Sequence, residues 1–176
     1  MSAEDRVPPP PAAAVWFPIA DAERWRADAA CDPEAYWASS VDRVVWSRRP
    51  ARIFEGSLRE PHWFPDGELN VTESCLDRHA ASHPDAIAYH YEREDGAARS
   101  VSYAGLLDEV NRLAGALRAD GIARGDRVVI YVPLSIESIV AMLACARIGA
   151  IHCVVFAGLG SDALADRIRD AGARCV

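Results

Sequence analysis

The sequence predicts an α/β protein built on an incomplete doubly wound parallel sheet, preceded by an irregular, partly helical cap and a hairpin. Two observations support this fold class. From residue 103 to the end of the chain, segments with helical periodicity alternate with short, β-branched apolar runs. Each helical segment is followed by a glycine, the residue that most often ends a helix. Such alternation is typical of parallel strands joined by right-handed helical crossovers.

The first part of the chain has little regular pattern. Residues 1–14 contain the prolines Pro8–Pro11 and then Ala12–Ala14, which predicts an extended leader. A proline-rich ligand for an aromatic groove on a partner is the alternative. Residues 15–71 are rich in tryptophan and have only weak helical periodicity. We expect them to form a cap whose rings pack against a larger body.

The regular elements begin after the cap and fill residues 72–176. Thr72 is a candidate cap for a helix that runs to about Ser82. Two strands follow, at residues 86–91 and 99–103, and the turn signal Asp95-Gly96 between them predicts a hairpin.

The clearest helix covers residues 103–120. Ser102 is its candidate cap, and Gly121 is placed to end it. Its apolar side chains recur every three or four residues and form one stripe: Leu106, Leu107, Val110, Ala114 and Leu117. We therefore expect one face of this helix to pack against the core.

After this helix the chain follows the pattern of a parallel sheet. We expect, in order, a strand, a helix, a strand, a helix capped by Ser161 and the start of another strand, at residues 127–132, 134–148, 151–156, 162–171 and 173–176. The run 151–156 is apolar almost throughout, which predicts a buried strand with His152 as a hydrogen-bonded core residue. Because domain boundaries fall in exposed linkers, an end inside a strand predicts a missing carboxy-terminal portion of the same protein.

Composition and charge exclude several classes of function. The net charge of −7 argues against a nucleic-acid partner, because neutralising phosphates needs clustered cations. The apolar stretch 139–159 is interrupted by Arg147 and Gly149, so a buried helix followed by a strand explains it better than a membrane span. The five cysteines are scattered and no export signal is evident, so a reduced, cytoplasmic protein is expected.

One loop has the composition of a ligand site. Residues 156–161 lie between a predicted strand and a predicted helix, whose first N–H groups attract anions. Gly158 and Gly160 would let a ligand approach the backbone closely, although a merely structural turn explains the same glycines equally well.

No residue of the chain is predicted to be catalytic or to bind a metal. The sequence holds no phosphate-binding lysine loop, no nucleophile elbow and no metalloprotease motif. Cys75 and His79 lie four residues apart on a predicted helix, yet no further pair of ligands joins them. We expect them to be packed residues of a helix face.

Four strings resemble AMP-forming acetyl-CoA and propionyl-CoA synthetases, closely and in the right order. They are RGDRVVIYVP at 124–133, MLACARIGAIH at 142–152, VVF at 154–156 and ALADRI at 163–168. Upstream, ELN at 68–70, CLDRH at 75–79 and YW at 36–37 are similar to the same family. The resemblance covers roughly residues 34–176 and identifies the chain as an amino-terminal portion of such an enzyme.

The resemblance implies an adenylate-forming ligase that joins a short-chain carboxylate to CoA, with ATP and Mg²⁺, through an acyl-adenylate and pyrophosphate. It implies that Phe156, Ala157 and Gly158 lie beside the CoA nucleotide, although the family's Phe-Gly-Gly-Phe reads Phe-Ala-Gly-Leu here. The phosphate loop, the acyl pocket and the mobile carboxy-terminal domain with its lysine would lie beyond Val176. All 19 cationic side chains are Arg, so we expect the chain alone to catalyse nothing.

Two other interpretations stay open. A non-catalytic module would keep this half of a nucleotide-binding fold to bind a ligand, or to pair with another chain through an open sheet edge. A piece of a Rossmann-like dehydrogenase is disfavoured, because the chain lacks the GxGxxG fingerprint and an acidic residue suitably placed after it.

Overall fold

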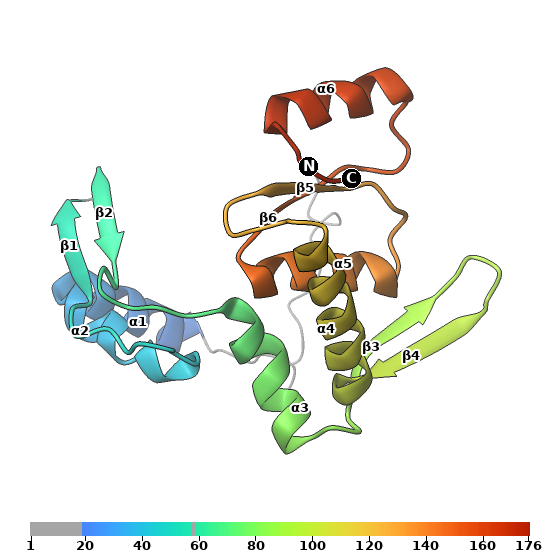
Figure 1. Ribbon diagram of the computed structural model, residues 1–176. Helices are drawn as coiled ribbons and strands as arrows, with labels where there is room; N and C mark the ends of the chain where they lie inside the picture. The colour runs from blue at the N-terminus through green and yellow to red at the C-terminus, as the bar shows by residue number, and fades with distance from the viewer. Residues whose placement is uncertain (1–18, 58) are drawn as a thin grey trace, which may run out of the picture. The chain divides into compact units, whose positions relative to one another are not determined.

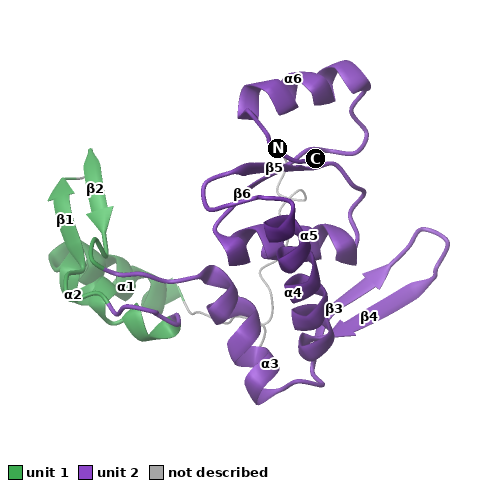
Figure 2. Cartoon of the chain, viewed as in Figure 1, with its two compact units in different colours: residues 1–43, 50–66 green, residues 44–49, 67–176 purple. Residues whose placement is uncertain are grey.

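The computed structural model describes residues 19–57 and 59–176, and the chain divides into two compact units (Figure 2). The first unit contains the described residues up to Arg43 together with 50–66, and the second contains 44–49 and 67–176. The leader predicted at residues 1–14 lies outside the described residues. The division of the chain at residues 14 and 71 stays a prediction.

The first unit combines helices with a hairpin (Figure 1). Its helices are α1 (Ile19–Cys31), α2 (Pro33–Ala38) and the 3₁₀ helix η3 (Val41–Arg43), and β1 (Phe54–Ser57) pairs antiparallel with β2 (Glu60–Trp63). Helix α2 begins where Asp32 accepts a hydrogen bond from the Ala35 N–H at 2.9 Å. The sequence does not predict the hairpin, since the strand β2 contains a proline, a residue that argues against a strand.

Aromatic rings of the first unit pack on one another. The ring centroids of Trp37 and Trp63 lie 5.7 Å apart in an edge arrangement, and Phe54 lies 4.7 Å from Trp63. Trp37 remains 43% exposed and Trp63 40% exposed. The prediction that the tryptophan rings are buried against a larger body is therefore wrong for these two residues.

The first helix of residues 67–176 contains a segment wider than an α-helix. Residues 73–77 form the π-helix η4 (Glu73–Asp77), which continues as α3 (Arg78–Ser82). Thr72 lies within the helical segment and has no capping bond. Instead, Asn70 Oδ1 accepts a hydrogen bond from the Thr72 N–H at 3.0 Å, so the predicted cap at Thr72 is wrong and Asn70 caps this helix.

The predicted hairpin and the long helix after it are confirmed. Strands β3 (Ile87–Glu92) and β4 (Ala98–Ser102) pair antiparallel, and α4 spans Tyr103–Ala119. Ser102 Oγ accepts a hydrogen bond from the Gly105 N–H at 3.2 Å, which makes it the cap of α4. Gly121 follows the helix with a φ of 82°, a conformation that glycine adopts without strain.

The remaining elements form the start of a doubly wound sheet. They are β5 (Arg127–Ile130), α5 (Ile136–Ile148), β6 (Ile151–Val154) and α6 (Ser161–Ala171). Strands β5 and β6 are parallel, and Cys175 pairs parallel with Val128 on β5. Helices α5 and α6 lie on opposite sides of the two strands (Figure 1). The predicted α/β class is confirmed.

The core of the second unit lies between α4, α5 and one face of β5. Its buried apolar residues include Leu76, Leu106, Val110, Leu117, Val128, Ile136, Val140, Ala144, Cys145 and Ile148. This core fixes β5, and through it the strand ends from which the loops of the site emerge.

Strand β6 is formed as predicted but is not buried. Ile151 is 54% exposed and Val154 56% exposed, and His152 is exposed as well. The reason is that β6 pairs with β5 along one edge, and no strand among the described residues covers the other. The prediction of a buried strand with a core histidine is therefore wrong for the chain as it stands. No helix of the described residues has the length and apolar character needed to cross a membrane.

Candidate functional site

The loop that joins β6 to α6 follows the carboxyl end of a parallel strand. We call residues 156–160 the glycine turn. The first residue after the strand, Val155, is buried, and its N–H donates to the Ile130 carbonyl at 2.9 Å. The next residue, Phe156, is 77% exposed, and its carbonyl accepts a hydrogen bond from the Leu159 N–H at 3.1 Å. The chain therefore leaves the sheet and closes a tight turn within four residues.

The glycine turn is tied to the neighbouring strand by a tyrosine. Tyr131 comes directly after β5, and its hydroxyl lies 2.6 Å from the Leu159 carbonyl oxygen and 3.0 Å from that of Ala157. A phenol has one proton to donate, so the two carbonyls share it. The Tyr131 side chain is only partly exposed.

Helix α6 begins without a side-chain cap. The sequence predicts Ser161 as the cap, but the capping position is Gly160, which has the extended backbone of a cap (φ −72°, ψ 167°) and no side chain. The first N–H groups of any helix lack an acceptor within the helix. Among the described residues no side chain caps the start of α6, and the positive end of the helix dipole lies beside the glycine turn.

The two glycines of the turn differ in their surroundings. A Cβ atom at Gly160 would meet no other atom within 4 Å. A Cβ atom at Gly158 would lie 2.4 Å from Cε1 of the Phe156 ring, so that ring covers the backbone of Gly158. The open backbone position of the turn is therefore Gly160, and access to Gly158 depends on where the Phe156 ring lies.

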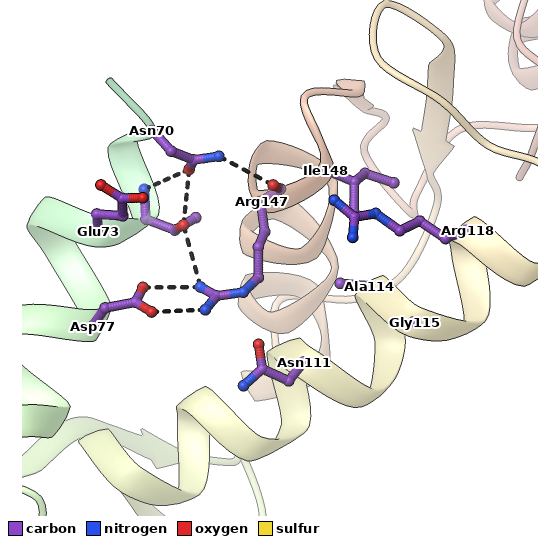
Figure 3. A pocket seen from close by; sticks show the side chains of 10 residues that line it. Asn70, Glu73, Asp77, Asn111, Ala114, Gly115, Arg118, Arg147 and Ile148 are labelled. Atoms are coloured by element: carbon purple, nitrogen blue, oxygen red, sulfur yellow. Dashed lines mark hydrogen bonds and ion pairs between the residues drawn. The ribbon is translucent and has the colours of Figure 1, made fainter. Parts of the chain in front are cut away.

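Apart from the glycine turn, the second unit has a hollow of about 360 Å³ among η4, α4 and α5 (Figure 3). It contains a two-pronged ion pair in which the Arg147 guanidinium donates to the two Asp77 carboxylate oxygens at 2.6 and 2.8 Å. Arg147 also donates to Thr72 Oγ1 at 3.3 Å, and Asn70 Nδ2 donates to the Ala146 and Arg147 carbonyls. Because these polar groups satisfy one another, we interpret the hollow as a structural junction.

The charges of this junction are strongly coupled. The hydrogen bonds from Arg147 hold the pKa of the Asp77 carboxyl below its usual value, more than burial raises it. The same bonds raise the pKa of Arg147. Both groups are therefore charged at neutral pH, as a partly buried ion pair requires.

Among the described residues no further ligand joins Cys75 and His79, and Cys75 is exposed, so the prediction that both are packed is wrong for Cys75. The His79 ring stacks on Tyr103 with centroids 5.0 Å apart, and its Nε2 accepts a hydrogen bond from Arg78 Nε at 3.2 Å. Burial raises the pKa of the Cys75 thiol, which disfavours the thiolate that binds metals. Across residues 19–57 and 59–176, no group of three or more His, Cys, Asp or Glu side chains is arranged to hold a metal ion.

The structure places the three predicted site residues together, since Phe156, Ala157 and Gly158 are consecutive members of the glycine turn. Sequence reasoning missed Tyr131. The signal that would have pointed to it is its position: the carboxyl ends of adjacent parallel strands lie at one edge of a sheet, so a polar side chain just after β5 lies beside the loop that follows β6.

Comparisons with known proteins assign the family. The model described as the acetyl-coenzyme A synthetase N-terminus matches residues 22–75, and the one described as AMP-binding enzyme matches residues 76–176. An acetyl-coenzyme A synthetase of Streptomyces avermitilis is 47% identical over 150 residues, which are 84% of this chain and 23% of that protein. One of Burkholderia thailandensis is 49% identical over 151 residues, 82% of this chain and 22% of its own length.

A solved structure, the acetoacetyl-CoA synthetase from Streptomyces lividans, matches with a TM-score of 0.80 at 30% sequence identity. The match covers 89% of this chain and 24% of the chain of that synthetase. The chain thus spans less than a quarter of the length of these relatives. The AMP-binding enzyme match covers more than half of the chain. The chain therefore belongs to the AMP-binding enzyme family.

Proposed function

We propose that this chain is the amino-terminal part of an acetate–CoA ligase. The observation that carries the proposal is the order of the two family matches, which follow each other without a gap over residues 22–176. Such a ligase activates acetate or propionate with ATP and Mg²⁺ to an acyl-adenylate, and then transfers the acyl group to CoA. The enzyme works in the cytoplasm on small molecules and has no nucleic-acid partner.

Within that enzyme, residues 1–14 are a leader, residues 15–71 a cap and residues 72–176 the start of the adenylation domain. The contribution of this chain is the CoA subsite at Phe156, Ala157 and Gly158. The free N–H groups at the start of α6 fit an anion such as a CoA phosphate, because they are donors at the positive end of a helix dipole. The carboxylate, ATP and Mg²⁺ are bound by the carboxy-terminal portion.

Two measurements test the activity. The complete protein that contains this chain is expected to catalyse acetate-dependent exchange of pyrophosphate into ATP, and to form AMP when CoA is added. The 176-residue chain alone is expected to do neither, since it has no lysine to stabilise charge on a transferred phosphoryl group. Pyrophosphate release by the purified chain with acetate and ATP would contradict the proposal.

A matched pair of variants tests the CoA subsite. Gly160→Asp and Gly160→Asn both supply a side-chain cap to α6, and both fit, since nothing lies near the new Cβ. Only the aspartate places a negative charge where a CoA phosphate would bind. In the complete protein we expect Gly160→Asp to raise the KM for CoA clearly more than Gly160→Asn, with pyrophosphate exchange unchanged in both.

Equal KM values for CoA in the two variants would show that the start of α6 does not face the anion. Gly158→Val, which is also expected to weaken CoA binding, is a less specific test. The valine would displace the Phe156 ring as well as crowd the backbone, so its effect would not separate the ring from the ligand.

A non-catalytic interaction module is the second candidate, and the exposed edge of β6 favours it. Ile151 and Val154 are both more than half exposed, on a strand whose outer edge pairs with no other strand of the described residues. The reading frame downstream of the Val176 codon distinguishes the two. A glycine-rich Ser/Thr loop followed by a lysine in that frame supports the ligase, and a stop codon supports the module.

A further inference from the structure

The backbone of the glycine turn has a defined orientation. Every peptide bond of the described residues is trans, so each N–H points opposite to the carbonyl of the same peptide. The Ala157 and Leu159 carbonyls face the Tyr131 hydroxyl. The N–H groups of Gly158 and Gly160 therefore point away from Tyr131.

The Gly160 N–H lies on open backbone, and the Gly158 N–H becomes accessible to a ligand when the Phe156 ring moves aside. Neither has an acceptor within residues 19–57 and 59–176, whereas the N–H of Leu159 between them is bonded inside the turn. They continue the row of free N–H groups at the start of α6. The orientation of the carbonyls thus decides whether the turn presents donors or acceptors on its open side.

Tyr131 is the side chain that sets this orientation. In the described part of the chain, its hydroxyl makes the hydrogen bonds that connect the glycine turn to the adjacent strand β5. Phe156, Gly158 and Gly160 are exposed and provide little packing that could hold the turn by itself. The tyrosine, by contrast, follows a strand whose Val129 and Ile130 are buried. The turn therefore takes its geometry from the sheet through one phenol group.

We propose that Tyr131 is a positioning residue for CoA: it does not contact the ligand, but holds the Ala157 and Leu159 carbonyls inward so that the Gly158 and Gly160 N–H groups face the CoA phosphates. This role rests on the proposed function of the glycine turn. Without the hydroxyl, the two carbonyls are free to turn outward, where they repel an anion.

The test is Tyr131→Phe in the complete protein, which removes the hydroxyl and keeps the ring. We expect the KM for CoA to rise about five-fold, the size of effect that one neutral hydrogen bond produces. Acetate-dependent pyrophosphate exchange, which does not involve CoA, is expected to stay within experimental error. A general loss of folded protein would lower both half-reactions, so the split between them separates positioning from mere stability.

Tyr103→Phe is the matched control. It makes the same chemical change on α4, where the ring stacks on His79, and it should leave the KM for CoA unchanged. In addition, hydrogen exchange of the backbone amides of residues 157–163 should become faster in Tyr131→Phe and not in Tyr103→Phe.

The outcomes are distinct. If wild type uses CoA and Tyr131→Phe has the same KM for CoA, the positioning role is refuted while the proposed function stands. If wild type exchanges pyrophosphate but never forms a thioester with CoA, the proposed function fails and the role of Tyr131 in it fails too. A raised KM for CoA with unchanged exchange supports both.

Discussion

Asp77 and Arg147 are 70 residues apart in the sequence and form two parallel hydrogen bonds of 2.6 and 2.8 Å (Figure 3). The pair joins the π-helix η4 to the last turn of α5. Its side chains are 32% and 24% exposed, so the ion pair is partly shielded from water. An ion pair of this geometry is stronger than an exposed one, because water and salt screen its attraction less.

The first prediction concerns acid stability. Since the pKa of Asp77 is lowered in the folded protein, its contribution is fully present above the unfolded pKa, near 4, and is lost as the pH falls through the folded value. We expect Asp77→Asn to lower the free energy of unfolding at pH 7 by about 1–3 kcal/mol. This deficit should shrink as the pH is lowered below about 4. Urea unfolding at several pH values measures it.

The control for this prediction is Asp108→Asn, which removes a pair with Arg112 whose side chains are 69% and 70% exposed. Exposed pairs contribute little, so this variant should differ from wild type by less than about 0.5 kcal/mol. An Asp77→Asn deficit that is the same at pH 7 and pH 2 would contradict the assignment to the carboxylate charge.

The second prediction concerns helix caps. Ser102→Ala removes the acceptor for the Gly105 N–H and should cost about 1 kcal/mol of stability. Ser161→Ala should cost much less, because Ser161 is the first residue of α6 and not its cap. Thermal unfolding of the two variants checks this difference. Equal losses would show that Ser161 caps α6 after all.

The third prediction concerns thiol reactivity. Burial raises the pKa of Cys145, and the neighbouring Cys175 raises it further, so the reactive thiolate is disfavoured. We expect Cys145, which has no exposed surface, to resist a thiol reagent at pH 8 until the chain is unfolded in urea. Cys31, which is exposed, should be modified in the folded protein. Peptide mass spectrometry distinguishes them, and equal rates would place Cys145 outside the core.

The fourth prediction concerns the open edge of β6. An exposed apolar strand with unpaired backbone groups favours association between copies, and a lysine at such an edge opposes it. Val154→Lys should therefore raise the highest concentration at which light scattering still shows the 176-residue chain as a monomer. Ile19→Lys, at a 78% exposed position of α1, is the control and should have little effect. The reverse order of the two variants would show that association does not use β6.

The helix periodicity and the glycines were sufficient to predict most elements of the second unit. The stripe of α4 and its cap at Ser102 are confirmed because both are local properties of the sequence. The cap of α6 could not be placed, since Gly160 has no side chain to mark it. The exposure of Val154 is a property of what covers β6 and not of β6 itself.

The candidate site shows the same limit. Phe156, Ala157 and Gly158 are predicted from a strand, a turn and a resemblance, all of which are continuous in the sequence. Tyr131 reads as part of an apolar run, and only the parallel pairing of β5 and β6 brings it to a turn 26–28 residues further along.

The π-helix at 73–77 gives this part of the chain one residue more than an α-helix of the same rise would hold. There the Arg78 N–H bonds to the Glu73 carbonyl, five residues back, instead of the four of an α-helix. Deleting a single residue from the segment would restore ordinary α-helical spacing and leave the two flanks roughly in register, because a π turn holds one residue more than an α turn. The residues inside the segment would shift, among them Ser74, which accepts the Val45 N–H, and Asp77, which pairs with Arg147. Which of these two contacts is lost therefore depends on which residue of the segment is deleted.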